Sequence, residues 1–146
     1  MKIDAFLRES PMFAIGRAAR RFEALGVTAL AADHLSFFEG LVLAALFFEA
    51  PRFVKPSQLA ETFSTTRGNV SHCVTSLEAK GLLQRRIDPD DARAFHLMLN
   101  AQGRRCAVRV IAALDHLQRG FEQEIGKAAL RETLKSIRMM ESLYKA

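Results

Sequence analysis

The sequence predicts a mainly α-helical protein in which a β-hairpin interrupts a series of six helices. Three observations predict this order. Apolar residues recur at helical spacing over most of the chain, prolines and glycines separate these runs, and only two short stretches alternate apolar and polar residues as strands do. The 146 residues suffice for one domain with a hydrophobic core, and no linker divides them.

The first helix is expected to begin at Pro11. Ser10 is a suitable N-cap, proline is favoured in the first helical turn, and apolar residues then recur every three to four positions. Gly26 is expected to end this run, because glycine often follows the last helical residue. Residues 1–9 are expected to form an earlier turn or arm.

The second helix is expected from about residue 34. Ser36 and Glu39 have the S-x-x-E spacing of a capping box, in which each side chain binds the backbone N–H of the other residue. The body of the helix, residues 37–50, is apolar on nearly every face, and Pro51 ends it. A helix that is apolar all round is buried, so we expect this one at the centre of the fold.

Two short helices are expected next. Pro56 fits the first turn of the third helix, and a break at Ser64-Thr65 separates it from the fourth. The fourth helix is expected over residues 67–80, with Thr66 as its N-cap and Gly81 as its stop.

Two extended runs follow, residues 82–87 and 94–99, and the turn-rich segment 88–93 joins them into a β-hairpin. Asn100 then caps a long helix, and a last helix follows Gly126. Two short helices with a tight turn, followed by a hairpin, are the layout of a winged helix-turn-helix. In that motif the second short helix enters the major groove of DNA.

The fourth helix has a face suited to that role. On a helical wheel Val70, Val74 and Leu77 share one face and are expected to pack inward. The first turn carries Arg67 and Asn69, whose side chains can pair with guanine and adenine, respectively. An ordinary amphipathic surface helix is the alternative. The outward face is small and polar, as entry into a groove requires, and consists of Gly68, His72, Thr75, Ser76 and Ala79.

The predicted hairpin is basic, which favours the DNA-binding alternative. Arg85 and Arg86 stand at its base, Arg93 lies near its tip, and His96 is expected on its surface. A positive ribbon beside a polar helix attracts the phosphates of a duplex, and the net charge of +5 agrees with an anionic partner. Simple solvation of a strand edge is the alternative interpretation of Arg85 and Arg86.

Three stretches of this region occur in a specific order. They are LEAKGLLQRR over residues 77–86, DPDDAR over residues 88–93 and LNAQG over residues 99–103. In order and spacing they resemble the MarR family, the multiple-antibiotic-resistance regulators, whose pattern reads LEkkGLv-R, DpxDxR and LTxxG. The resemblance is strongest over residues 56–103. Asn100 in place of threonine and Gly68 in the fourth helix depart from it.

The resemblance implies a division of the single chain, residues 1–146, into two parts. Residues 52–99 would be the DNA-binding winged helix-turn-helix, with a wing of two to three strands. The long helices of residues 1–50 and 100–146 would form a dimerisation part, so that a homodimer places two recognition helices on a pseudo-palindromic operator.

The resemblance also implies that Arg93 enters the minor groove and that Asp91 holds its guanidinium by a charge-assisted pair. Together with the residues chosen above, this completes the expected DNA interface. It consists of Thr66, Arg67, Gly68, Asn69, His72, Thr75, Ser76, Arg85, Arg86, Asp91 and Arg93.

Three weaker features bear on regulation. Four phenylalanines are expected to line a pocket for a small aromatic or anionic effector, unless they form plain core: Phe22, Phe37, Phe38 and Phe47. The neighbouring arginines 104, 105 and 109 are expected to lower the pKa of Cys106, as a redox sensor requires, unless this cysteine is structural. Asp33-His34 and Asp115-His116 have zinc-binding side chains, but Gly120 stands where a further histidine would complete the set, so no metal site is predicted.

Composition and motifs narrow the class of function. No stretch reaches the roughly 20 apolar residues of a transmembrane helix, and two distant cysteines suit a reduced, cytoplasmic chain. No phosphate-binding loop, HExxH motif or nucleophile elbow is present, so we expect neither an enzyme nor a cofactor. The sequence predicts a homodimeric transcriptional repressor that binds specific double-stranded DNA and responds to a small effector. A winged-helix module that binds protein, and a redox- or metal-responsive regulator of the same fold, remain as alternatives.

Overall fold

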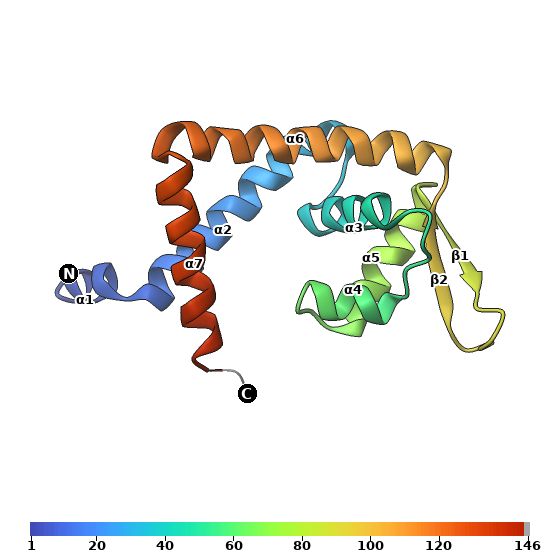
Figure 1. The fold of residues 1–146 in the computed structure, drawn as a ribbon, viewed down its shortest axis with the longest axis horizontal. Helices are drawn as coiled ribbons and strands as arrows, with labels where there is room; N and C mark the ends of the chain where they lie inside the picture. The colour runs from blue at the N-terminus through green and yellow to red at the C-terminus, as the bar shows by residue number, and fades with distance from the viewer. Residues whose placement is uncertain (145–146) are drawn as a thin grey trace. The chain divides into compact units, whose positions relative to one another are not determined.

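The computed structural model describes residues 1–144, and Figure 1 shows the order of their elements. Helices dominate this range and a two-stranded sheet lies between α5 and α6, which confirms the predicted fold class. Residues 1–111 form one compact unit, and the chain from Ala112 onward forms a second. Among residues 1–144 no helix has the length and apolar composition needed to cross a membrane.

The chain begins with α1 (Ile3–Glu9), so residues 1–9 form a helix of their own, and α2 (Pro11–Ala29) follows. Ser10 is the predicted N-cap of α2, because its Oγ accepts a hydrogen bond from the backbone N–H of Phe13 at 3.3 Å. The prediction that Gly26 ends this helix is wrong. Gly26 is buried under the ring of Phe37, which would overlap any Cβ at that position, so it is a packing residue inside the helix.

A short 3-10 helix, η1 (Ala31–Asp33), leads to α3 (Phe37–Glu49), the central helix of the first unit. The predicted capping box is present: Ser36 Oγ accepts from the Glu39 N–H and Glu39 Oε1 accepts from the Ser36 N–H, both at 3.0 Å. Several apolar side chains of α3 are fully buried, and the helix contacts α2, α5 and β2. The expected central position of this helix is therefore confirmed.

The two short helices are α4 (Pro56–Thr62) and α5 (Arg67–Ala79), which pack on each other. Leu59 of α4 and Val70 and Leu77 of α5 are buried between these helices and the rest of the unit. Gly81 has a φ of +73°, the left-handed conformation that ends a helix and that glycine adopts most readily.

The hairpin pairs β1 (Leu83–Ile87) with β2 (Phe95–Leu99) in antiparallel register, so that Leu83 faces Leu99 and Ile87 faces Phe95. Val54, in the loop after α3, bridges to Leu97, whose N–H donates to the Val54 carbonyl at 2.8 Å. This isolated bridge ties the hairpin to the loop after α3, and the sheet itself has two strands.

The helix α6 (Ala101–Ile125) begins at the base of the wing. Asn100 is its predicted cap: Oδ1 accepts from the Gly103 N–H at 2.8 Å, and Nδ2 donates to the Gly81 carbonyl at 2.6 Å. Gly103 packs directly on the backbone of Leu82. The second unit contains the rest of α6, Gly126 with a φ of +83°, and α7 (Lys127–Ser142).

Candidate nucleic-acid interface

The helix α5 exposes the face that the sequence predicted, with one exception. Thr66 caps it, since its Oγ1 accepts from the Asn69 N–H at 3.1 Å. The apolar side turns inward, and Cys73 joins the predicted Val70, Val74 and Leu77 there. Gly68, His72, Thr75 and Ala79 are exposed as predicted. This helix lies beside the hairpin in Figure 1, and it contacts β1.

Ser76 is the exception, and its assignment to the exposed face is wrong. Its side chain is half-buried, and the hydroxyl donates to Glu39 Oε2 at 2.9 Å. The buried carboxylate requires donors, and Ser76 lies at the edge of α5 that faces α3. The hydroxyl is therefore an internal contact between the two helices.

Glu39 connects α5 to the central helix α3. Besides Ser76, its carboxylate binds the ammonium of Lys80 at 2.9 and 3.0 Å, and Lys80 Nζ also donates to the His34 carbonyl at 2.8 Å. Burial raises the pKa of Glu39, but hydrogen bonds from the Ser36 backbone, Lys80 and Ser76 outweigh it, so the pKa lies below its ordinary value of 4.5. The charged carboxylate is thus stabilised inside the fold, and α5 is held at its C-terminal end.

The first turn of α5 offers two exposed polar side chains. Arg67 extends from an exposed position, and no ion pair holds it within the described chain. Asn69 donates from Nδ2 to Thr65 Oγ1 at 2.9 Å, which orients the amide at the start of the helix. Arg67 is therefore the more available of the two for a phosphate or a guanine edge.

Arg85 does not extend into solvent from the wing base. Its Nη2 donates to Thr75 Oγ1 at 2.6 Å, its Nε lies 3.5 Å from Glu78 Oε1, and its guanidinium carbon lies 5.9 Å from the centre of the Phe95 ring. Only about a quarter of the side chain, 26%, is exposed. Arg85 thus contacts α5 and β2, and its direct contact with DNA stays a prediction. Arg86 is exposed.

The wing tip carries Arg93 in an exposed position, but the expected ion pair with Asp91 is not formed in the part of the chain that the structure describes. Asp91 Oδ1 instead accepts from the backbone N–H of Arg93 at 3.0 Å. Aspartate commonly closes a tight turn by accepting from a backbone N–H two residues later, and Asp91 makes this local bond in place of the ion pair. Asp91 therefore shapes the tip, and the guanidinium of Arg93 extends from it.

A polar cluster that the sequence does not predict lies where the strands of the hairpin meet the loop between them. His96 is half-buried, not on the surface as expected, and its Nε2 lies 2.9 Å from Asp88 Oδ2. Lys55 Nζ lies 3.4 Å from the same carboxylate, and the His96 ring stacks on Phe53 with centroids 5.1 Å apart. The pKa of Asp88 is lowered, chiefly because Asp88 accepts a hydrogen bond from the backbone of Asp90 and also faces Lys55 and His96.

The four phenylalanines of the expected pocket have different neighbours. Phe37 lies over Gly26 of α2, Phe38 packs edge-on against Phe63, and Phe47 packs edge-on against Phe48. Phe22 lies on α2 with 49% of its surface exposed. The pocket between them stays a prediction.

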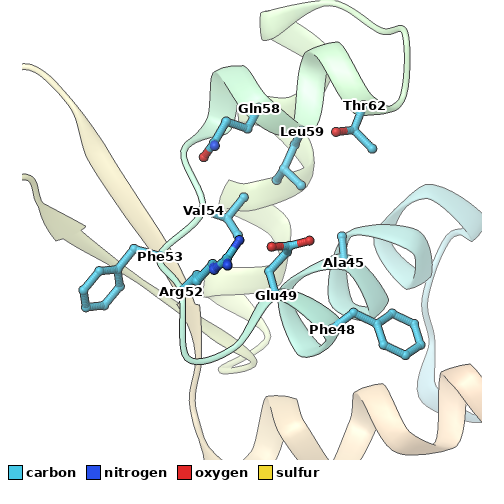
Figure 2. Close-up of a pocket in the computed structure, with 9 residues that line it drawn as sticks. All are labelled: Ala45, Phe48, Glu49, Arg52, Phe53, Val54, Gln58, Leu59 and Thr62. Carbon is cyan, nitrogen blue, oxygen red and sulfur yellow. The ribbon is translucent and has the colours of Figure 1, made fainter.

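A hollow lies elsewhere, between the end of α3, the following loop and α4. Its volume is about 410 Å³, within the range of small-molecule sites. Figure 2 shows Glu49 and Arg52 in the middle of this hollow, with Gln58 and Thr62 on the α4 side. Its apolar lining consists of Ala45, Phe48, Phe53, Val54 and Leu59. None of the four predicted phenylalanines lines it.

Both cysteines are buried, and neither has the lowered pKa of a redox sensor. Burial, together with the charge of Glu39, raises the pKa of Cys73 to about 12. Burial and the carboxylate of Asp33 raise the pKa of Cys106, against the effect of Arg109. The expected lowering at Cys106 is wrong because Arg109 binds Asp33, with Nη2 and Oδ1 at 2.6 Å, and brings a carboxylate to the thiol.

Asp33, one of the residues considered as a metal ligand, is thus paired with an arginine, and its pKa lies below its ordinary value mainly because of that hydrogen bond. His34 has the left-handed conformation at the end of η1, and its carbonyl accepts from Lys80. Over residues 1–144, no group of three or more histidine, cysteine, aspartate or glutamate side chains is placed to hold a metal ion.

The comparisons with known proteins agree with this architecture. The family model described as MarR family matches residues 49–95, the segment from the end of α3 to the start of β2. No curated protein matches the chain.

Three solved structures illustrate the likeness of fold. MepR of S. aureus in a complex with DNA has a TM-score of 0.87 and 16% identity, covering 92% of this chain and 98% of MepR. The transcriptional regulator BldR from Sulfolobus solfataricus has a TM-score of 0.77 and 25% identity, covering 99% of both chains. The transcriptional repressor CouR bound to p-coumaroyl-CoA has a TM-score of 0.80 and 23% identity, covering 94% of this chain and 96% of CouR. The resemblance to the MarR family is therefore confirmed, by sequence over residues 49–95 and by fold over nearly the whole chain.

Proposed function

We propose that the chain is a transcriptional regulator that binds specific double-stranded DNA as a homodimer. One observation carries this proposal: the outward face of the first two turns of α5 is polar and free of carboxylates, and it lies on the same unit as the exposed arginines 86 and 93 of the wing. Small polar side chains suit the edges of base pairs, and flanking arginines suit phosphates and the minor groove. The DNA complex of MepR, which shares the fold, supports the same conclusion.

The proposed dimer is supported by exposed apolar side chains outside the winged part. They lie on α1, α2, α6 and α7 and include Phe6, Met12, Phe22, Leu25, Ile125, Leu134 and Met139. Burial of such apolar side chains against a second copy would stabilise a dimer. A twofold dimer would place two copies of α5 on successive major grooves, about 10 base pairs apart.

Repression and a small effector complete the proposed function, which would operate in the cytoplasm. CouR, a repressor with this fold, binds p-coumaroyl-CoA. The hollow of about 410 Å³ beside α4 offers this chain space for a ligand, and α4 packs on the recognition helix. A ligand bound in the hollow would therefore act on the position of α5 through α4.

Selection of bound sequences from a random duplex pool tests the proposed function. The purified chain should enrich one pseudo-palindrome, and its affinity for that duplex should fall by about 1,000-fold or more between 50 and 200 mM salt if six or more phosphates are contacted. Light scattering on the same sample should give the mass of a dimer. A reporter gene placed behind the enriched sequence should be silenced when the chain is expressed.

Two outcomes would overturn the proposed function. If the pool yields no enriched sequence at low salt, the chain does not read DNA. If binding to duplexes is weak and insensitive to salt while a protein partner is retained, the fold serves as a protein-binding module instead.

A further inference from the structure

The contacts of Arg85 and Thr75 bear on how the recognition helix reads a base. Arg85 on β1 reaches across to α5, where its Nη2 donates to Thr75 Oγ1 at 2.6 Å. Two weaker contacts flank the guanidinium: Glu78 Oε1 on α5, which lies 3.5 Å from Nε without a hydrogen bond, and the ring of Phe95 on β2, whose centre lies 5.9 Å from the guanidinium carbon. Thr75 itself is exposed on the outward face of α5. The arginine is thus fixed within the fold, and its contact is with the hydroxyl of a residue that faces outward.

This contact restricts what the hydroxyl of Thr75 can do. A threonine hydroxyl has one hydrogen to donate and two lone pairs that accept. Arginine has donors only, so the Arg85 bond occupies a lone pair and leaves the hydrogen for another partner. A charged donor on the oxygen also polarises the O–H bond and makes that hydrogen a stronger donor.

The usual internal partner for that hydrogen is not used. A threonine within a helix often donates to the carbonyl one turn earlier, as Thr28 does to Ala24 at 3.1 Å and Thr133 does to Ala129 at 2.8 Å. Across residues 1–144, Thr75 makes no such bond, and its hydroxyl interacts with Arg85 instead. The hydrogen of Thr75 is therefore available on the exposed side of the helix.

We propose that Arg85 is a positioning residue that makes Thr75 a directed hydrogen-bond donor, and that Thr75 thereby reads a base with an acceptor in the major groove. This role rests on the DNA-binding function proposed above. Guanine, adenine and thymine each present an acceptor on the major-groove edge, whereas cytosine presents only its amino donor. Thr75 is therefore expected to prefer guanine, adenine or thymine to cytosine, whose amino group can bind only the remaining lone pair of the hydroxyl, a weaker acceptor beside the Arg85 cation.

The experiment starts from the duplex that the wild-type chain enriches. Each base pair of one half-site is replaced in turn, and each duplex is titrated with wild type, Thr75→Val, Thr75→Ser, Arg85→Ala, Arg85→Lys and the double variant Thr75→Val/Arg85→Ala. Arg86→Ala is the matched control, because it is the adjacent wing arginine and is exposed. Circular dichroism and the salt dependence of binding are measured for every variant.

Wild type should reject cytosine at one position by about two- to tenfold, the value of one hydrogen bond. Thr75→Val and Arg85→Ala should both lose this rejection, and the double variant should lose no more than Thr75→Val alone. Thr75→Ser and Arg85→Lys should recover part of it, because they retain a hydroxyl and a donor. Arg85→Ala should keep the salt dependence of wild type, whereas Arg86→Ala should weaken all duplexes alike and reduce the salt slope by about one.

Three results would overturn the role of Arg85. Arg85→Ala could weaken every duplex equally and reduce the salt slope, which would make Arg85 a phosphate contact. The effects of the two single variants could add, which would make them independent. Thr75→Val could still reject cytosine fully, which would show that the hydroxyl of Thr75 does not read the base. Valine has the shape of threonine and the site is exposed, so this variant should fold and tests the proposal even if Arg85→Ala does not fold. If wild type enriches no sequence, the DNA-binding function fails as well, and the two failures are distinguished.

Discussion

Substitution of Gly103 by alanine tests the junction between the long helix and the wing. Gly103 is the third residue of α6, and a Cβ there would overlap the carbonyl oxygen of Leu82 and approach its carbonyl carbon to 2.8 Å, closer than real Cβ contacts come. Both atoms belong to the backbone, so no side chain can turn away. The start of α6 or the segment before β1 must therefore move.

The cost of this movement can be worked from the contacts. Overpacking of a buried site costs about 1–3 kcal/mol. Displacing α6 also stretches the hydrogen bond from Asn100 Nδ2 to the Gly81 carbonyl, which is 2.6 Å long in the wild type. Loss of this bond adds about 1 kcal/mol to the cost. Alanine regains about 0.5–1 kcal/mol of helix propensity. Gly103→Ala should therefore lower the free energy of unfolding by about 1–3.5 kcal/mol in total.

Gly68→Ala is the matched control. Gly68 is the second residue of α5, and the nearest atom to its would-be Cβ is Thr66 Oγ1 at 3.9 Å, an ordinary contact. This variant should raise the free energy of unfolding by about 0.5–1 kcal/mol or leave it unchanged. Urea unfolding followed by circular dichroism, with equal slopes for all variants, measures both. If Gly103→Ala is as stable as wild type, the close approach of α6 to Leu82 is not present in solution.

Three further predictions follow from the ion pairs and arginines. Glu39→Gln should lower the free energy of unfolding by about 1–2 kcal/mol at pH 7, because Lys80 loses a charged acceptor. Glu49→Gln, on the exposed end of α3, is the control and should change the free energy of unfolding by no more than about 0.5 kcal/mol. The pKa of Glu39 is lowered by folding, so its contribution is present above its ordinary pKa of 4.5 and is lost as the pH falls below it. Urea titrations from pH 7 to pH 3 should thus show a weaker loss of stability for Glu39→Gln, and an acid profile identical to wild type would refute this. Arg93→Ala should weaken binding to the enriched duplex by about 1–3 kcal/mol in fluorescence anisotropy without changing the unfolding curve, and unchanged affinity would remove Arg93 from the minor groove. Arg67→Ala should reduce the preference for the enriched sequence more than it reduces the affinity for random duplexes. An equal loss of affinity for all duplexes would instead make Arg67 a phosphate contact.

The features that the sequence predicts well have local causes. The caps at Ser10, Ser36, Thr66 and Asn100 are all formed, because an N-cap side chain reaches only two or three residues along its own chain. The hairpin follows from alternation and from the turn between the strands. Gly26 shows the limit of such inference. Glycine is favoured both at helix ends and at close contacts between helices. At Gly26 the reason is the close contact, with the ring of Phe37 from another helix, and the local sequence does not show that contact.

Polar residues of α5 and the wing show why the candidate site could be predicted only in part. A polar side chain that is exposed and one that is buried against a polar partner give the same pattern on a helical wheel, so the wheel assigns Ser76 to the outward face although it binds Glu39. A strand pattern likewise does not show that Thr75 and Glu78 lie within reach of Arg85.

One signal in the sequence could have located Ser76 and Lys80. Glu39 lies in a helix that is otherwise almost wholly apolar, and a carboxylate buried in such a helix needs donors from a neighbouring element. Ser76 and Lys80 are four residues apart, on one face of the helix expected to pack nearby, and together they supply a hydroxyl and an ammonium. The capping box satisfies one carboxylate oxygen of Glu39, and the second oxygen requires a partner from outside the helix. Counting the unsatisfied acceptors of a buried residue therefore predicts tertiary contacts that periodicity alone does not.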